Sequence, residues 1–325
     1  MLTPQPDAAR AFFARLLALL SGRSLTDAAS GFRIVRRSSL RTITPLPGTP
    51  LYRGMVRDER IIDHRWEHYD YRHVVFRPRR MSPEQLQNGV DWLIGEFYSA
   101  RRIVRRVFAE LDDTIGFEAR WGEGDVAEGG AVLGVVRGAA RPILSGERTA
   151  LNFLGRMCGI ATAAREAVAE IEGTGSCVLD TRKTAPGLRL LDKYAVAAGG
   201  ARNHRLGLFD EVMIKDTHVA VAGPVGEAVR RALAAGHPPA IVTAEARSEE
   251  EMEEAIRAGA KRVLLDNMEP EVLRRCVRRA AGRARLEASG GLRPGRLREV
   301  AETGVDFLSL GWLTHSSPCA DVALE

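Results

Sequence analysis

From residue 176 onward, short apolar runs alternate with longer segments in which apolar residues recur at helical spacing. Six of the apolar runs resemble β-strands: 177–179, 212–215, 240–245, 262–266, 285–289 and 306–310. Four segments resemble helices: 224–235, 248–258, 270–281 and 294–303. Three of these four open with proline, which is favoured at the first helical position. Strands that alternate with helices predict a parallel α/β barrel. Because a complete barrel has eight strands, six strands predict an incomplete barrel.

The region before residue 176 has patterns of its own. A long helix is predicted to start near Glu147 with Ser145 as its N-cap, because the following apolar residues recur at helical spacing. Short strands between glycine-containing turns are predicted at 115–121, 124–126 and 131–137. Further upstream, Ser82 followed by Pro83 predicts the start of a helix that continues to about Arg106.

Composition places the chain among soluble globular proteins, with 45% hydrophobic and 27% charged residues. The net charge of +5 would suit an anionic ligand and nucleic acid equally well, so charge alone does not choose between them. The four cysteines form no CxxC pair, which argues against a zinc or iron–sulfur site. The apolar segment 12–20 is short and contains Arg15, so we predict neither a membrane span nor a signal peptide and expect a cytoplasmic protein.

Basic residues are concentrated between residues 180 and 218, at the ends of predicted strands and beside glycine-rich turns. Arg182 and Lys183 follow the first strand, and Lys215 ends the second. The ends of the later strands carry acidic or small residues: Glu245, Asp266, Ser289 and Gly311. In a parallel barrel these ends all lie on the face that carries catalytic residues. A surface ion pair would explain any one of the cations, but an anionic ligand better explains the whole set.

The acids and the glycine turns at this face suggest separate ligands. Glu245 and Asp266 supply the hard oxygen donors that Mg²⁺ prefers, usually together with substrate phosphate oxygens. The turns at 289–291 and 310–316 follow predicted strands and can offer backbone N–H groups to a phosphate. The sequence therefore predicts carboxylate, phosphate and metal binding at one rim.

Three motifs in this segment are long enough to indicate a family. They read DTRKTAPGLR from Asp180, KYAVAAGGARNHRLGL from Lys193 and IKDTH from Ile214. Together they resemble quinolinate phosphoribosyltransferase, and the resemblance covers roughly residues 100–325. The related molybdenum-transport-associated paralogue usually lacks the RNHR and IKD forms, so it is the weaker match.

The resemblance implies an incomplete parallel α/β barrel of the type II phosphoribosyltransferase kind over residues 146–325. The last part of an α/β open-sandwich domain precedes it at residues 108–145. Residues 1–107 form an atypical N-terminal segment. Within that segment, residues 12–37 resemble a fragment of a family-2 glycosyltransferase, and residues 42–107 resemble the tail of B12-binding radical SAM proteins. Neither fragment brings the catalytic motifs of those enzymes.

The resemblance also implies an activity. A phosphoribosyl group would pass from phosphoribosyl pyrophosphate to quinolinate with decarboxylation, giving nicotinate mononucleotide, pyrophosphate and CO₂, with Mg²⁺ as cofactor. The expected partners are these two substrates and a second copy of the chain in a homodimer, with no nucleic acid and no membrane. Because the N-terminal domain is incomplete, the alternative is an impaired homologue that acts only as a structural or assembly subunit.

Residue roles follow from the same resemblance. The implied catalytic residues are Lys183, Lys215, Glu245 and Asp266, of which Glu245 and Asp266 hold the metal. The residues implied to bind the quinolinate carboxylates are Arg148, Arg182, His204 and Arg205. The residues implied to bind the 5-phosphate lie in the two glycine turns: Ser289, Gly290, Gly311 and His315. In the family, the arginine that corresponds to Arg148 reaches into the site of the partner subunit.

Overall fold

The computed structural model describes residue 45 and residues 50–65, 68, 73–79, 81–208 and 210–325. Its contacts divide the chain into one unit, Met1–Trp92, and a second unit, Leu93–Glu325, and each is described by itself. The glycosyltransferase-like segment, 12–37, lies outside the described residues.

In the first unit, helix α3 (Pro50–Arg57) precedes helix α4 (Pro83–Tyr98), which extends past the unit boundary. Helix α4 begins where the sequence predicts, because Ser82 Oγ accepts a hydrogen bond from the Gln85 N–H group at 3.1 Å. In return, Gln85 Oε1 accepts a hydrogen bond from the Ser82 N–H group at 2.9 Å. This reciprocal pair satisfies two backbone donors that a helix start leaves without partners.

The prediction that this helix continues to Arg106 is wrong. The chain leaves α4 at Tyr98 and forms a new helix, α5 (Ala100–Ala109). Ser99 is the N-cap of α5, and its side chain accepts a hydrogen bond from the Arg102 N–H group at 3.4 Å. Serine favours such capping positions over helix interiors because its hydroxyl competes for backbone donors.

The two short strands that follow α5 form a separate antiparallel pair, β1 (Gly116–Ala119) and β2 (Gly134–Arg137). Residues 124–126, predicted as a strand, form part of a turn and loop. Helix α6 (Ala140–Glu170) starts earlier than predicted, and Ser145 lies within it rather than at its N-cap. The Ser145 hydroxyl instead donates to the Arg141 carbonyl at 2.9 Å, a bond that ties it to the preceding turn.

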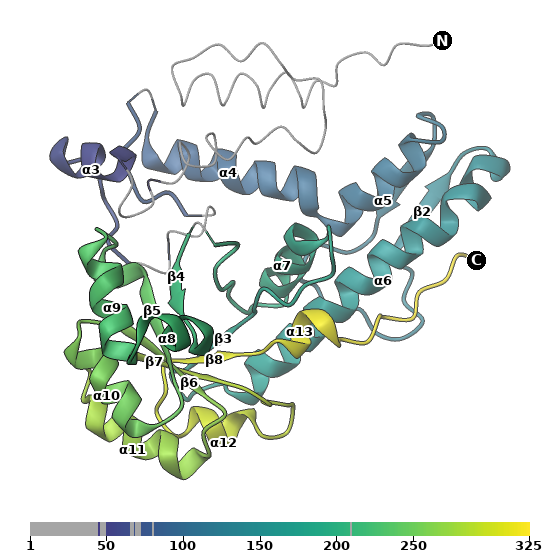
Figure 1. Cartoon of the computed structure of the whole chain (residues 1–325). Coiled ribbons are helices and arrows are strands. Elements are labelled where there is room, and N and C mark those ends of the chain that lie inside the picture. The colour runs from purple at the N-terminus through teal and green to yellow at the C-terminus, as the bar shows by residue number, and fades with distance from the viewer. Residues whose placement is uncertain (1–44, 46–49, 66–67, 69–72, 80, 209) are drawn as a thin grey trace. The chain divides into compact units, whose positions relative to one another are not determined.

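All six strands predicted after residue 176 are present. They are β3 (Cys177–Leu179), β4 (Val212–Ile214), β5 (Val242–Ala246), β6 (Arg262–Asp266), β7 (Arg285–Ser289) and β8 (Phe307–Ser309). They form one parallel sheet in the order β3-β8-β7-β6-β5-β4. The last strand therefore pairs with the first, while β3 and β4 end the sheet without pairing with each other. This arrangement is the incomplete parallel barrel that the sequence predicts (Figure 1).

The four predicted helices are also present between the later strands. They are α9 (Val225–Ala234), α10 (Glu249–Arg257), α11 (Pro270–Ala280) and α12 (Leu297–Ala301). The rest of this region contains α7 (Arg189–Ala198), α8 (Asp216–Ala222), the 3₁₀ turn η2 (Pro239–Ile241) and, after β8, α13 (Trp312–His315). No helix among the described residues is both long and apolar enough to cross a membrane.

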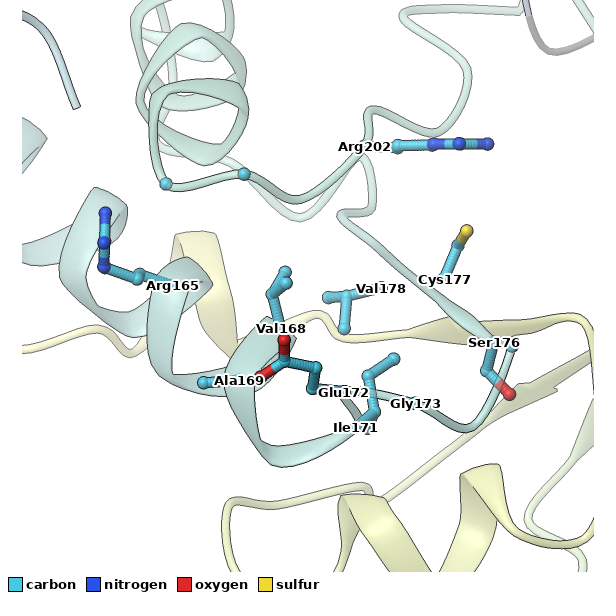
Figure 2. A pocket seen from close by; sticks show the side chains of 13 residues that line it. Arg165, Val168, Ala169, Ile171, Glu172, Gly173, Ser176, Cys177, Val178 and Arg202 are labelled. Atoms are coloured by element: carbon cyan, nitrogen blue, oxygen red, sulfur yellow. The ribbon is translucent and has the colours of Figure 1, made fainter.

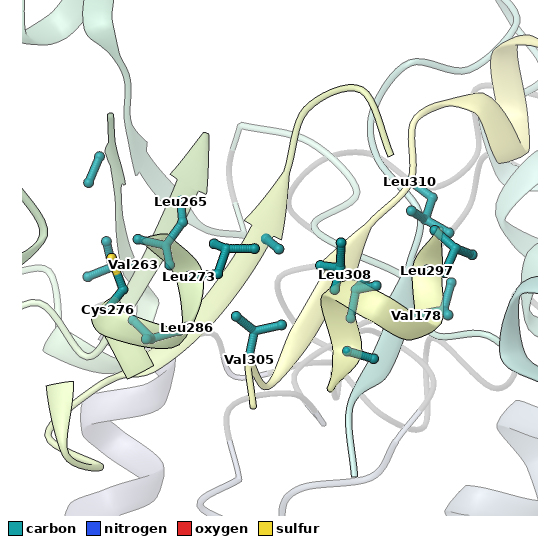
Figure 3. Close-up of a cluster of buried hydrophobic side chains, with 14 of the residues drawn as sticks. Val178, Val263, Leu265, Leu273, Cys276, Leu286, Leu297, Val305, Leu308 and Leu310 are labelled. Carbon is teal, nitrogen blue, oxygen red and sulfur yellow. The ribbon is translucent and has the colours of Figure 1, made fainter. Parts of the chain in front are cut away.

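The hydrophobic core lies between the sheet and its helices. Val263 and Leu265 of β6 are fully buried with Leu286 of β7, and Leu273 and Cys276 of α11 belong to the same cluster (Figure 3). Because successive residues of a strand point to opposite faces, the residues between these apolar positions point into the barrel. The core thus fixes which face of each strand carries the polar side chains.

Candidate active site

The carboxyl ends of the parallel strands carry polar residues on the face turned away from the covering helices. Asp266 is in register with Ser289, and Ser289 with Ser309. Glu245 is in register with Leu264, which lies two residues before Asp266 and therefore on the same face. The pairing of the sheet brings these side chains together at one rim although they are far apart in the sequence.

Lys215 joins this rim from the end of β4. Ile214 is in register with Ala244, so the next residue along, Lys215, comes beside Glu245. The Lys215 ammonium nitrogen lies 2.7 Å from Glu245 Oε2. The Glu245 side chain is 7% exposed and that of Lys215 is 42% exposed. The Glu245 carboxylate therefore fixes the Lys215 ammonium group on one side, and the other side of this group remains accessible to a ligand.

Lys183 and the final glycine turn meet on the other side of the rim. A Cβ atom added at Gly311 would lie 3.1 Å from Lys183 Cδ and 3.3 Å from His315 Nε2. A larger residue at this position would force both side chains to shift by a few tenths of an ångström. The Thr314 hydroxyl donates to the Lys183 carbonyl at 2.8 Å, which fixes this loop against α13. The structure thus brings together Lys183, Gly311 and His315, which the sequence assigns to neighbouring parts of one site.

The turn after β7 is built for close backbone approach. Gly290 has φ +97°, and a Cβ atom there would lie 2.2 Å from Asn267 Oδ1, so no other residue fits without movement. The Asn267 N–H group donates to the Ser289 carbonyl at 2.8 Å, which fastens this turn to the neighbouring strand end. The turn at Ser289 and Gly290 is therefore held in one conformation at the rim.

Arg205 is partly buried and is held by neighbours near the start of β4. Its guanidinium donates to the Glu211 carbonyl at 3.2 Å and approaches Met213 Sδ at 3.5 Å. Burial lowers the pKa of Arg205, and the positive charge of Arg182 lowers it further. The charges of Glu211, Asp210 and Glu287 act in the opposite direction, so the Arg205 guanidinium lies among charges of both signs.

The side chain of His204 is buried, and its ring nitrogens lie close to other groups of the protein. Its Nδ1 accepts a hydrogen bond from the Arg205 N–H group at 2.6 Å, and its Nε2 lies 3.3 Å from Glu287 Oε1. The side chain is 5% exposed. As placed, both ring nitrogens face groups of the protein, and the assignment of His204 to quinolinate stays a prediction.

Beneath the rim lies a buried polar layer that the sequence analysis missed. Glu287 is fully buried, with Arg262 Nη2 2.6 Å from its Oε2, and it also accepts a hydrogen bond from the Ser309 hydroxyl. Burial by itself would raise the pKa of Glu287, but Arg262, His204 and Ser309 together hold it well below its usual value. The signal was present in β7, where Glu287 stands alone between the apolar residues Leu286 and Ala288.

A second buried ion pair fixes the backbone of the loop that carries His204 and Arg205. The Lys193 ammonium lies 2.6 Å from Asp180 Oδ1 and donates to the His204 carbonyl at 2.9 Å. The same Asp180 oxygen accepts the His204 N–H group at 2.7 Å. Lys193 is one of the cations concentrated in this segment. Because its charge is neutralised by the buried Asp180, it does not supply a cation to a ligand at the rim.

Arg156 of α6 fixes the loop that carries Lys183. Its guanidinium forms a fork with both Asp192 carboxylate oxygens, at 2.8 and 2.7 Å, and donates to the Thr314 carbonyl at 2.9 Å. The Asp192 carboxylate in turn accepts the Ala185 N–H group at 3.0 Å. The fork therefore connects α6, α7 and the final turn, and it holds the chain on both sides of Lys183 in place.

Arg148 lies on α6 away from these buried groups. Its side chain is 73% exposed, and its one contact among the described ion pairs is with the adjacent Glu147 at 3.4 Å. The structure thus leaves this guanidinium free to bind a group outside its own chain. A role in the partner subunit stays a prediction.

A cavity of about 600 Å³ lies near the amino end of β3, away from the rim, and Figure 2 shows the side chains that line it. It is lined by the end of α6, by Ser176 and Cys177 at the amino end of β3, and by the loop at Gly199 and Arg202. The rim is formed by the opposite, carboxyl ends of the strands. None of the residues assigned to substrates or metal lines this cavity, so its size gives no support to a catalytic role.

The described residues do not form a ready metal site. No group of three or more His, Cys, Asp or Glu side chains among them is placed to hold an ion. One oxygen of Glu245 is bonded to Lys215 and the other lies 3.9 Å from Arg247, while Asp266 Oδ2 accepts from Asn267 at 3.0 Å. With Glu245 facing two cations and Asp266 bonded to an amide, these acids as placed do not form the near-octahedral set of oxygens that a resident Mg²⁺ needs. The assignment of Mg²⁺ to Glu245 and Asp266 stays a prediction.

Comparisons with known proteins agree on one group. Family models described as "Quinolinate phosphoribosyl transferase, C-terminal domain" and "N-terminal domain" match residues 160–325 and 97–158. A probable nicotinate-nucleotide pyrophosphorylase [carboxylating] of Bacillus subtilis (strain 168) is 40% identical over 228 residues, covering 70% of this chain and 79% of the relative. The Synechocystis protein of the same description is 38% identical over 68% of this chain and 76% of its own length.

Solved structures give the same result. The nicotinate-nucleotide pyrophosphorylase from Francisella tularensis superposes with a TM-score of 0.65 at 36% identity, covering 68% of this chain and 79% of that structure. The corresponding protein from Ehrlichia chaffeensis gives a TM-score of 0.66 at 34% identity, covering 69% and 81%. The chain therefore shares the fold of these proteins over about two thirds of its length.

Proposed function

The chain belongs to the quinolinate phosphoribosyltransferase family, and on this premise we infer that it transfers a phosphoribosyl group from phosphoribosyl pyrophosphate to quinolinate. The products are nicotinate mononucleotide, pyrophosphate and CO₂, which places the reaction in NAD biosynthesis. One observation supports this function most strongly: the carboxyl ends of the parallel strands carry Lys215 against Glu245, Lys183 beside Gly311, and the close turn at Gly290. The comparisons give no support to the alternative of a purely structural subunit.

The chemistry requires two anions to meet in one orientation. The pyridine nitrogen of quinolinate forms a bond to C1 of the ribose as the bond from C1 to the pyrophosphate oxygen breaks. Loss of the 2-carboxylate as CO₂ then leaves its electron pair on the ring carbon, which takes up a proton. No step needs a covalent bond to the protein, so catalysis depends on position and on complementary charge.

We assign the rim residues to these two ligands. Arg182 and Arg205 are cations whose planar guanidinium groups suit the two carboxylates of quinolinate. The rigid turns at Gly290 and Gly311 suit the 5-phosphate of the donor because their backbone can approach it closely. Lys215, with one exposed side, and Lys183, beside Gly311, would neutralise the charge that develops on the departing pyrophosphate.

The direct test is release of nicotinate mononucleotide. Purified protein is incubated with quinolinate, phosphoribosyl pyrophosphate and Mg²⁺, and the product is measured by chromatography. We expect formation of nicotinate mononucleotide and pyrophosphate in equal amounts. The matched control replaces quinolinate by nicotinate, which would give the same mononucleotide without loss of CO₂. We expect no product from nicotinate, because it lacks the 2-carboxylate that the proposed site binds. A folded protein that releases no nicotinate mononucleotide would contradict the proposed function and favour the structural alternative.

We further propose a homodimer in which Arg148 serves the site of the partner subunit. Arg148→Ala and Lys183→Ala proteins, each inactive alone, should then regain activity when they are refolded together. Random mixing restores about a quarter of wild-type sites, because about half of the dimers are mixed and each mixed dimer has one intact site. A mixture that forms dimers, as shown by size-exclusion chromatography, but stays inactive would show that Arg148 serves its own chain.

A further inference from the structure

Arg247 lies at the rim but is assigned no role above. It follows β5, and its Nη2 lies 2.7 Å from Asp216 Oδ2 and 3.9 Å from Glu245 Oε1. Asp216 opens α8 directly after Lys215, whereas Glu245 belongs to β5. The guanidinium therefore bridges acids from two neighbouring strand ends.

The contacts of Arg247 are those of a countercharge rather than those of a core ion pair. Its side chain is 56% exposed and that of Asp216 is 46% exposed, while Glu245 is 7% exposed. The hydrogen bond to Asp216 raises the pKa of Arg247, with smaller contributions from the charges of Glu245 and Asp266. Three carboxylates thus act on one guanidinium at the solvent side of the rim.

The charge balance of this group depends on Arg247. Asp216, Glu245 and Asp266 carry three negative charges, and Lys215 neutralises one of them. Without Arg247 the group would keep an excess of negative charge and several carboxylate oxygens without a cation. Such a group suits a divalent ion, which needs hard oxygen ligands of opposite charge. With Arg247 present, those oxygens face a guanidinium instead.

We propose that Arg247 is a fixed cation that occupies the place of a protein-bound divalent ion at this rim. The substrate-free protein then has no resident metal site between Asp216 and Glu245. A further consequence, which rests on the proposed function, is that the pyrophosphate of the donor meets a guanidinium here. The planar fork of arginine can bind two phosphate oxygens at once, so Arg247 supplies a charge partner for the leaving group from the protein itself.

The test measures Mn²⁺ binding to substrate-free protein by electron paramagnetic resonance of the free ion. Arg247→Gln removes the charge, and we expect its Mn²⁺ affinity at the rim to exceed that of the wild type by about tenfold or more. Arg247→Lys keeps a cation and should bind Mn²⁺ as weakly as the wild type. The matched control is Arg231→Gln, which removes an equally exposed arginine that pairs with Glu227 on α9. It should behave as the wild type, because it changes the net charge but not the rim.

A second variant locates the gained site. Adding Glu245→Gln to Arg247→Gln should remove the gain, because Glu245 lies between Lys215 and Arg247. Wild-type protein that binds Mn²⁺ as tightly as Arg247→Gln would overturn the proposal, as would a gain that survives in the double variant. These measurements use no substrate, so their failure is distinct from failure of the proposed activity.

Discussion

Replacing Lys183 with alanine is expected to lower turnover of quinolinate by about 10²–10³-fold, the usual effect of removing one preorganised charge contact to a transition state. Lys183 is exposed at the rim and packs beside Gly311 and His315, so its removal leaves the buried core intact. Lys215→Ala should have a similar effect, because the Lys215 ammonium is fixed by Glu245 on one side and accessible on the other. The measurement is the rate of nicotinate mononucleotide formation at saturating concentrations of both substrates.

The chain offers a matched control for these two variants. Lys261 is also exposed, but it precedes β6 and therefore lies at the amino ends of the strands, opposite the rim. Lys261→Ala should keep wild-type turnover and an unchanged melting temperature. Near-normal turnover in purified, folded Lys183→Ala or Lys215→Ala protein would show that these lysines do not contact the reacting groups.

The second large effect concerns stability. Glu287→Gln should lower the free energy of unfolding by about 3 kcal/mol, because it leaves the buried guanidinium of Arg262 without its counterion. Urea unfolding followed by circular dichroism measures the change. The control is Glu271→Gln, since Glu271 is 71% exposed and its ion pair with Arg274 should contribute little. Equal stability of the two variants would mean that the buried layer is not a stabilising ion pair.

The same residue predicts how stability depends on pH. The pKa of Glu287 in the folded protein lies below its ordinary value of 4.5 because Arg262, His204 and Ser309 favour the ionised form over the opposing effect of burial. Its contribution is therefore fully present above the unfolded pKa and is lost as the pH falls toward the folded pKa. In Glu287→Gln this part of the acid destabilisation should be missing, so its unfolding free energy should fall less steeply between about pH 5 and pH 3. An identical slope in both proteins would contradict this assignment.

The sequence predicted the later elements well because their boundaries are local. The apolar runs around Val263 and Leu286, and the proline that starts α11, each act within a few residues. The errors occurred where a local signal had two meanings. Ser145 resembles an N-cap but lies inside α6, and Ser99, which was read as part of one long helix, starts a new one.

The sequence by itself also determined which residues end each strand, and so which side chains could reach the rim. Lys183, Lys215, Glu245, Asp266 and Gly311 could be named because parallel strands in a barrel present their carboxyl ends on one face. That inference requires only the order of strands and helices. It says nothing about which of these side chains contact each other.

Only the tertiary structure decided the partners, because each pairing joins residues that are distant in sequence and depends on strand register. Register placed Lys215 against Glu245 and Arg262 against Glu287. The packing of α6 against α7 placed Arg156 on Asp192, and the approach of two strand ends placed Arg247 between Asp216 and Glu245. A cation in the sequence carries the same charge wherever it lies. Whether that charge is buried in an ion pair, as in Lys193, or left accessible to a ligand, as in Lys215, is fixed by the fold alone.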